Sequence, residues 1–110
     1  MAVAMRVIDL SFTIRPHFRW LVSRQLRSSH DSGAIFQSSV LTVSCHAYTH
    51  VDAPVHFLPG DRDITAMPIV IEYLTNLDAI GVARCRFIAL PLAIEGADGS
   101  PVRAIALVED

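Results

Sequence analysis

The sequence predicts a single, predominantly β domain over residues 1–110. Its 110 residues are the length of one domain. Apolar types make up 52% of the residues and charged types 18%, the balance of a chain that folds rather than one that stays disordered. Short apolar and β-branched runs recur between clusters of Gly, Pro, Asp and Ser, which is typical of strands joined by turns.

The N-terminal part is expected to hold two strands separated by a long loop. Residues 7–10 are a short apolar run and predict the first strand. Residues 15–32 are polar and rich in Arg, which predicts a loop with room for one helical turn around 21–26. Residues 34–45 alternate weakly and end in β-branched residues, so a second strand is predicted there.

The C-terminal part is expected to alternate turns with strands. Residues 68–74 are apolar except for Glu72, which predicts a buried strand carrying one charge. The same rules predict a turn at 58–63, a helical turn before Gly81, a strand at 84–94 that bends at Pro91, a turn at 95–101 and a strand at 102–109.

Neither a nucleic-acid partner nor a membrane is expected. The formal net charge is −2, and the basic residues, all of them Arg, are scattered along the chain. The apolar stretches fall short of the roughly 18 residues that span a bilayer, and the N-terminal residues lack the pattern of a signal peptide. We therefore expect a cytoplasmic protein with reduced cysteines.

Four residues of metal-ligand type crowd into positions 46–56: His46, His50, Asp52 and His56. Imidazole nitrogens and carboxylate oxygens suit zinc, manganese, iron or nickel. Any one of these histidines could simply be a hydrogen-bonded polar residue, but four together in an apolar stretch are costly to bury unless something satisfies them. The adjacent Cys45 is either another ligand or a small buried side chain.

A shared ion would require the chain to curl between His46 and His50. In an extended strand, which rises about 3.3 Å per residue, the two would lie roughly 13 Å apart. Ligands of one ion lie about 3–3.5 Å from each other. Because Pro54 disfavours a helix at the residue before it, we predict a strand ending near Cys45, a tight turn over 46–50 and an extended exit through Asp52.

Several motifs, in order, resemble the cyclase family of metal-dependent hydrolases, which includes bacterial kynurenine formamidase and isatin hydrolase. Residues 46–57, HAYTHVDAPVHF, resemble the family signature HxGTHxDxPxHF. Residues 7–14, VIDLSFTI, are similar to its first strand, DLSHTI, and residues 71–78, IEYLTNLD, to its late segment xENLxNLD. Residues 87–92, FIALPL, and 96–104, GADGSPVRA, are similar to its C-terminal close, LPLxxxGxxGSPxRA.

The resemblance implies a function and a set of roles. It implies an α/β fold of the swivelling β/β/α type, here shortened and predominantly β, and hydrolysis of an amide or cyclic amide by a metal-activated water. His46, His50 and Asp52 would bind a divalent metal, zinc first and manganese second. Glu72 would be a further ligand, and His56 would be the general base.

The chain also departs from the family pattern. Tyr48 stands where the signature has glycine, Phe12 where the first strand has histidine, and no histidine follows His56. The family's middle region between the signature and the late segment is missing, which would expose apolar sheet. We therefore expect a homo-oligomer, a dimer or tetramer, in which His17 or His30 of a neighbouring subunit could supply a ligand.

The substrate is expected to be a small molecule, and no residue pattern in the sequence identifies it. Trp20, Phe18 and Phe57 could line an aromatic substrate pocket or simply pack. The alternative to an active hydrolase is a degenerate member of the family that binds a metal or small ligand, or that serves as an oligomeric scaffold.

Overall fold

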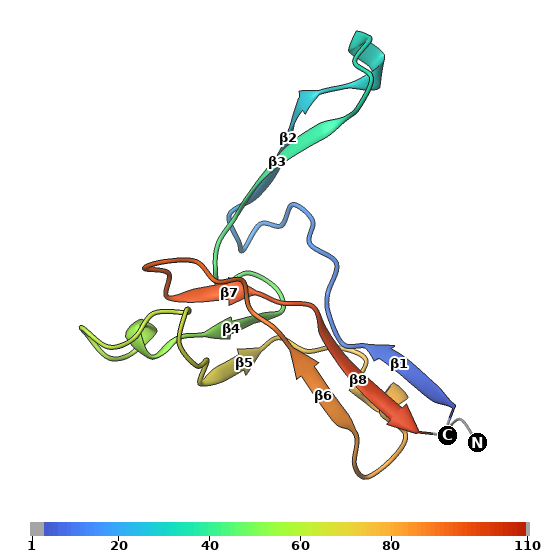
Figure 1. The fold of residues 1–110 in the computed structure, drawn as a ribbon, viewed down its shortest axis with the longest axis vertical. Helices are drawn as coiled ribbons and strands as arrows, with labels where there is room; N and C mark the ends of the chain where they lie inside the picture. The colour runs from blue at the N-terminus through green and yellow to red at the C-terminus, as the bar shows by residue number, and fades with distance from the viewer. Residues whose placement is uncertain (1–3, 110) are drawn as a thin grey trace.

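Three small antiparallel sheets make up the protein in this computed structural model, which describes residues 4–109 (Figure 1). The first sheet has the order β1-β8-β6, with β1 at Met5–Asp9, β6 at Arg86–Ala89 and β8 at Ala104–Glu109. The second pairs β2 (Val22–Ser28) with β3 (Ser38–Val43). The third has the order β5-β4-β7, with β4 at His50–Asp52, β5 at Val70–Glu72 and β7 at Gly99–Pro101.

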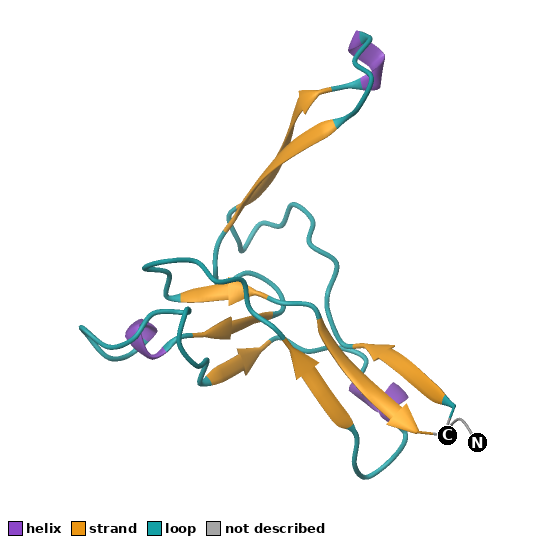
Figure 2. Cartoon of the chain, in the orientation of Figure 1, coloured by secondary structure: helices purple, strands orange, loops and turns teal. Residues whose placement is uncertain are grey.

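Helical structure within residues 4–109 is limited to single 3-10 turns (Figure 2). These are η1 (His30–Ser32), η2 (Pro54–His56) and η3 (Leu77–Ile80). The predicted helical turn before Gly81 is η3, and Gly81 follows it in the left-handed conformation with φ of 66°. The predominantly β character is therefore confirmed, whereas the swivelling α/β arrangement remains a prediction. No helix in the described range is long and apolar enough to cross a membrane.

The β2–β3 hairpin forms an arm that projects from the rest of the chain (Figure 1). The radius of gyration is 17.2 Å, against about 13 Å for a compact domain of this size. The prediction of a loop over 15–32 was wrong for its second half. β2 lies in this range, where its backbone pairs with β3 from Val22↔Val43 to Ser28↔Ser38. Because the backbone pairing alone forms this strand, its polar side chains can stay in solvent on both faces. The strand predicted at 34–45 begins later, at Ser38.

The core consists of two small apolar clusters. In one, Leu10 packs with Ala104 and Ala106 of β8; in the other, Val51 of β4 packs with Ala53 and Ile64. Val102 packs against both clusters and joins the first sheet to the third. The buried residues of β8 alternate along the strand, as the sequence predicts for its last strand.

Two predictions about the third sheet were wrong. The strand predicted to be buried at 68–74 is the short edge strand β5, where Ile71 is 39% exposed, because only β4 flanks it. The turn predicted at 95–101 ends instead in β7, which pairs with the other side of β4. The pairs Val51↔Ser100 and Asp52↔Gly99 make β4 the central strand, so neighbours on both sides can reach its side chains.

An exposed ion pair links the end of β1 to the residue that precedes β8. Asp9 accepts from Arg103 Nε at 3.0 Å and Nη2 at 2.5 Å, and from the Ser11 backbone N–H at 3.1 Å. The Arg103 hydrogen bonds, helped by that from Ser11, hold the pKa of the Asp9 carboxyl below its usual value.

The Asp9→Asn variant is expected to be slightly less stable than the wild type at pH 7. Because the folded-state pKa of Asp9 is lowered, its contribution is present above the unfolded-state pKa, near 3.9, and is lost as the pH falls through the folded-state pKa. The effect is small because both side chains are largely exposed. Urea unfolding between pH 7 and pH 2 measures it, and a difference in stability that stays constant over this range would contradict the assignment.

Candidate metal centre

The turn between β3 and β4 brings two histidines together. The Ala47 backbone N–H donates to the Ser44 carbonyl at 3.1 Å, and Tyr48 adopts a left-handed conformation with φ of 53°. As a result the ring centroids of His46 and His50 are 5.3 Å apart, where an extended strand would separate these residues by roughly 13 Å. The predicted tight turn and the extended exit through β4 are confirmed.

His46, His50 and Asp52 form a group in which each offers a ligand atom within 4.8 Å of the others. Asp52 lies between the two histidines, because its Oδ1 is 2.9 Å from His46 Nδ1 and 3.1 Å from His50 Nε2. His50 and Asp52 are two positions apart on β4 and both side chains are almost fully buried. These separations are close to those between ligands of one ion, about 3–3.5 Å.

A hydrogen bond made by His50 Nδ1 fixes which of the two ring nitrogens of His50 faces Asp52. His50 Nδ1 lies 2.7 Å from the Tyr48 carbonyl oxygen, which can only accept, so Nδ1 carries the hydrogen. Nε2 then faces Asp52 and, at 3.5 Å, Glu72 Oε2. Acceptor atoms that converge in this way require a cation between them, either a proton or a metal ion. These nitrogen and oxygen atoms therefore fit as ligands of a divalent cation.

The pairing of β4 with β5 explains the position of Glu72. Glu72 is the direct cross-strand partner of His50, which places its carboxylate beside the group although the two residues are distant in sequence. Its side chain is 45% exposed, so it lies at the open side of the site rather than inside a buried strand.

His56 and Asp98 extend the site on the side of His46 that faces away from β4. His56 lies at the end of η2, and its ring stacks on that of His46 with centroids 3.8 Å apart. His46, His56 and Asp98 also offer ligand atoms within 4.8 Å of one another. Asp98 was not predicted as a site residue. It approaches His46 because β7, which follows it, pairs with β4, and no local pattern signals that contact.

Cys45 belongs to neither of these groups of candidate ligands in the described range. The thiol is partly buried, and burial together with the negative charge of Asp98 raises its pKa.

The predicted aromatic residues lie on two different sides of the site. Trp20 packs on Tyr48, with ring centroids 4.4 Å apart, and on Tyr73 at 5.7 Å; Tyr73 in turn contacts His50 at 5.6 Å. Phe57 is 55% exposed and contacts His56 edge-on. Trp20 also lines a cavity of about 320 Å³, whose lining residues are Phe12, Thr13, Arg15, His17, Trp20 and Tyr48.

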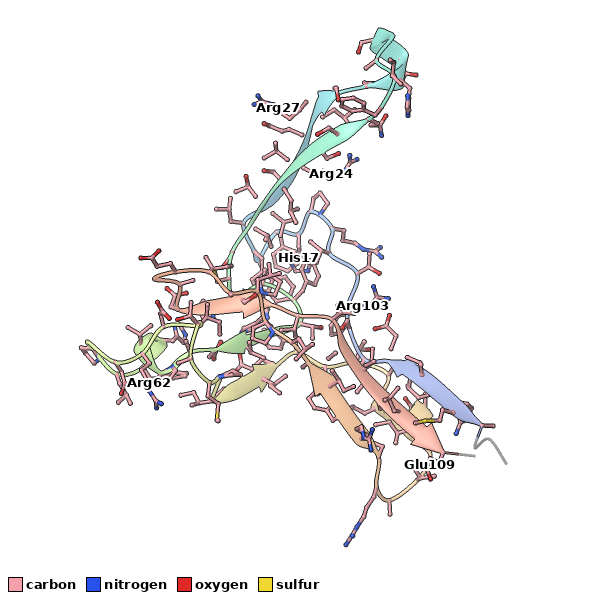
Figure 3. All side chains as sticks on the ribbon, in the orientation of Figure 1. His17, Arg24, Arg27, Arg62, Arg103 and Glu109 are labelled. Atoms are coloured by element: carbon pink, nitrogen blue, oxygen red, sulfur yellow. The ribbon has the colours of Figure 1, made fainter. Side chains whose placement is uncertain are left out.

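The two remaining histidines, His17 and His30, lie away from the cluster. His17 stacks on Phe18 and Trp20, at the base of the arm, and Figure 3 shows Arg24 and Arg27 further along it. His30 lies in η1, at the far end of the arm (Figure 1). Neither offers a ligand atom to the groups described above.

Comparison with known proteins finds a matching family model. No curated protein and no solved structure matches the chain. The family model Cyclase, described as "Putative cyclase", matches residues 8–88, which is most of the chain and includes every predicted ligand from His46 to Glu72. Asp98 lies outside the matched range. On this match the chain belongs to the cyclase family.

Proposed function

We propose that the chain is a metal-dependent hydrolase that cleaves the carbon–nitrogen bond of an amide or cyclic amide, similar to kynurenine formamidase. One observation carries the proposal: the ring nitrogens of His46 and His50 converge on the buried Asp52 carboxylate at 2.9 and 3.1 Å. A hydrolase of this class needs such a set of nitrogen and oxygen ligands with an open side.

In this proposal His46, His50 and Asp52 hold a divalent ion, and Glu72 is a further ligand at the exposed side. Two imidazoles and a carboxylate suit zinc best, with manganese as the second candidate. When bound, the ion would supply Lewis acidity to a carbonyl group and lower the pKa of a water molecule.

His56 is the proposed general base. It is exposed and lies beside His46 rather than within the buried group, so it is open to solvent next to the candidate ligands. In the reaction it accepts a proton from the attacking water and returns that proton to the leaving nitrogen.

The proposed substrate is a small amide attached to an aromatic ring. Trp20, Tyr48 and Tyr73 form a continuous aromatic cluster that reaches the buried side of His50. Phe57 offers a second aromatic surface beside His56. An aryl group could stack on Phe57, which is 55% exposed, whereas Tyr48 in the first cluster is almost fully buried.

Purified protein tests the hydrolase proposal directly. Protein prepared in zinc- and manganese-supplemented buffer is analysed for bound metal and assayed against an N-formyl aniline and isatin. We expect bound metal and turnover in the wild type and neither in His50→Ala. His56→Ala should keep the metal and lose about 10²–10⁴-fold in rate, whereas His30→Ala, at the distant arm tip, should behave as wild type.

Two outcomes would contradict the hydrolase proposal in different ways. A wild-type protein without metal would remove its basis. Bound metal without turnover on any amide or lactone would favour the second candidate, a family member that only binds a metal or small ligand or serves as a scaffold. Tyr48 in place of the signature glycine is the observation that favours this second candidate.

We also propose that residues 1–110 form one shortened cyclase-like domain that assembles into a homo-oligomer. The short connection from β4 to β5 supports the single domain, because it places Glu72 opposite His50 without a middle region. Exposed apolar side chains on the arm support the assembly, among them Ile35 at 94% and Phe36 at 69% exposure.

Light scattering on the purified protein measures the assembly. We expect the mass of a dimer or tetramer for the wild type and a shift toward monomer for the Ile35→Asp, Phe36→Asp double variant. Arg27→Asp, an exposed charge reversal on the same arm, serves as the control for charge alone. A monomeric wild type would contradict the proposed assembly.

A further inference from the structure

We propose that Asp98 is a positioning residue that orients His46 as a metal ligand; this inference rests on the proposed function. The His46 ring lies between two carboxylates. Its Nδ1 is 2.9 Å from Asp52 Oδ1, and its Nε2 is 2.9 Å from Asp98 Oδ1. Asp98 is 52 residues away in sequence and outside the range that matches the family model.

The hydrogen-bond chemistry of a neutral imidazole decides what Asp98 does. Such a ring carries one N–H and one lone pair. If Nε2–H donates to Asp98, the lone pair is on Nδ1, which faces Asp52 and the Nε2 atom of His50. This is the arrangement in which a carboxylate behind a histidine fixes its tautomer and raises its basicity as a ligand.

Backbone contacts with the end of β4 fix where Asp98 lies. The Asp98 carbonyl accepts from the Ala53 backbone N–H at 2.9 Å, and the next residue, Gly99, pairs with Asp52. Gly99 also contacts the His46 ring closely: a Cβ added at Gly99 would lie 2.7 Å from His46 Cε1. The ring is thus held by Asp98 at one nitrogen, by the Gly99 backbone at its edge and by His56 on one face.

A competing arrangement would place the ion on the other side of His46. There Nε2, His56 and Asp98 would be the ligands, and Nδ1–H would donate to Asp52. Burial favours the first arrangement, because the side chains of His50 and Asp52 are 1% and 3% exposed whereas that of Asp98 is 54% exposed. Buried acceptors have no water to satisfy them and depend on the cation, while exposed ones do not.

Zinc titration of purified variants tests the inference. The zinc affinity is measured by competition with a chromogenic chelator, and the number of bound ions by elemental analysis. Asp98→Ala is expected to weaken zinc binding by about 10–100-fold, the usual effect of losing such a partner. Asp98→Asn should bind more tightly than Asp98→Ala, because its amide oxygen can still accept from Nε2–H. Glu95→Gln, an exposed carboxylate in the same loop, is the matched control and should bind zinc as the wild type does.

A second readout does not depend on catalysis. In nitrogen-15 NMR spectra of the zinc-bound wild type, His46 should carry its proton on Nε2, and in Asp98→Ala that proton should exchange faster with water. Circular dichroism shows whether each variant is folded.

Each outcome of these measurements has one meaning. Asp98→Ala with wild-type zinc affinity would overturn this inference and leave the proposed function intact. A loss in Asp98→Asn as large as that in Asp98→Ala would also overturn it, because an amide oxygen that can still accept from Nε2–H would then restore nothing. A wild-type protein that binds no zinc would overturn the proposed function and, with it, the role of Asp98.

Discussion

Replacing Asp52 with alanine is expected to abolish tight zinc binding. Asp52 Oδ1 is the one atom that both candidate histidine ligands approach, His46 at 2.9 Å and His50 at 3.1 Å. Its loss removes the buried carboxylate ligand and leaves two imidazoles and the half-exposed Glu72. We expect the affinity to fall by more than the roughly 100-fold that marks the upper range for losing an outer partner of a ligand.

The loss of zinc binding in Asp52→Ala should be visible in the thermal unfolding of the protein. A ligand that binds only the folded state at 100 times its Kd stabilises that state by about 2.7 kcal/mol. Calorimetry should therefore show a zinc-dependent rise in the unfolding temperature of the wild type and none in Asp52→Ala. Asp78→Ala, which removes an exposed carboxylate in η3, should keep the full rise. An equal rise in Asp52→Ala would place the zinc elsewhere.

The histidine turn could be predicted from the sequence because local constraints act on it. Pro54 excludes a continuing helix, and the distance between extended His46 and His50 excludes a straight strand if the two share an ion. Tyr48 has a left-handed φ of 53°, a conformation that glycine, the signature residue at this position, adopts without steric cost. Tyr48 instead buries its ring against Trp20 and donates its hydroxyl to the Arg15 carbonyl at 2.7 Å.

The elements that the sequence did not predict depend on contacts between distant segments. β2 is exposed on both faces, so it carries no alternation of apolar and polar residues by which it could be recognised. β5 has the composition of a buried strand but lies at a sheet edge. The contact between Asp98 and His46 requires β7 to pair with β4, and the register of that pair is a property of the folded chain.

The Gly99→Ala variant is expected to lose both stability and zinc affinity. Gly99 lies in β7, where it is buried and where its φ is not in the left-handed region, so only space is at issue. The added Cβ would lie 2.7 Å from His46 Cε1 and 2.8 Å from the Val51 carbonyl oxygen. The Val51 oxygen belongs to the central strand and cannot move without disturbing β4. Such overpacking typically costs about 1–3 kcal/mol of unfolding free energy.

The zinc affinity of Gly99→Ala distinguishes the clash with the His46 ring from the clash with the Val51 carbonyl oxygen. If the His46 ring moves to relieve its contact, it leaves the position between Asp52 and Asp98, and zinc binding weakens along with stability. Gly96→Ala is the control, because Gly96 has φ of 77° and a Cβ added there would have no atom within 4 Å. That variant should lose stability from backbone strain but keep its zinc affinity. Urea unfolding and zinc titration of both variants measure this contrast. Wild-type zinc affinity in a folded Gly99→Ala protein would mean that the β7 backbone does not hold the His46 ring.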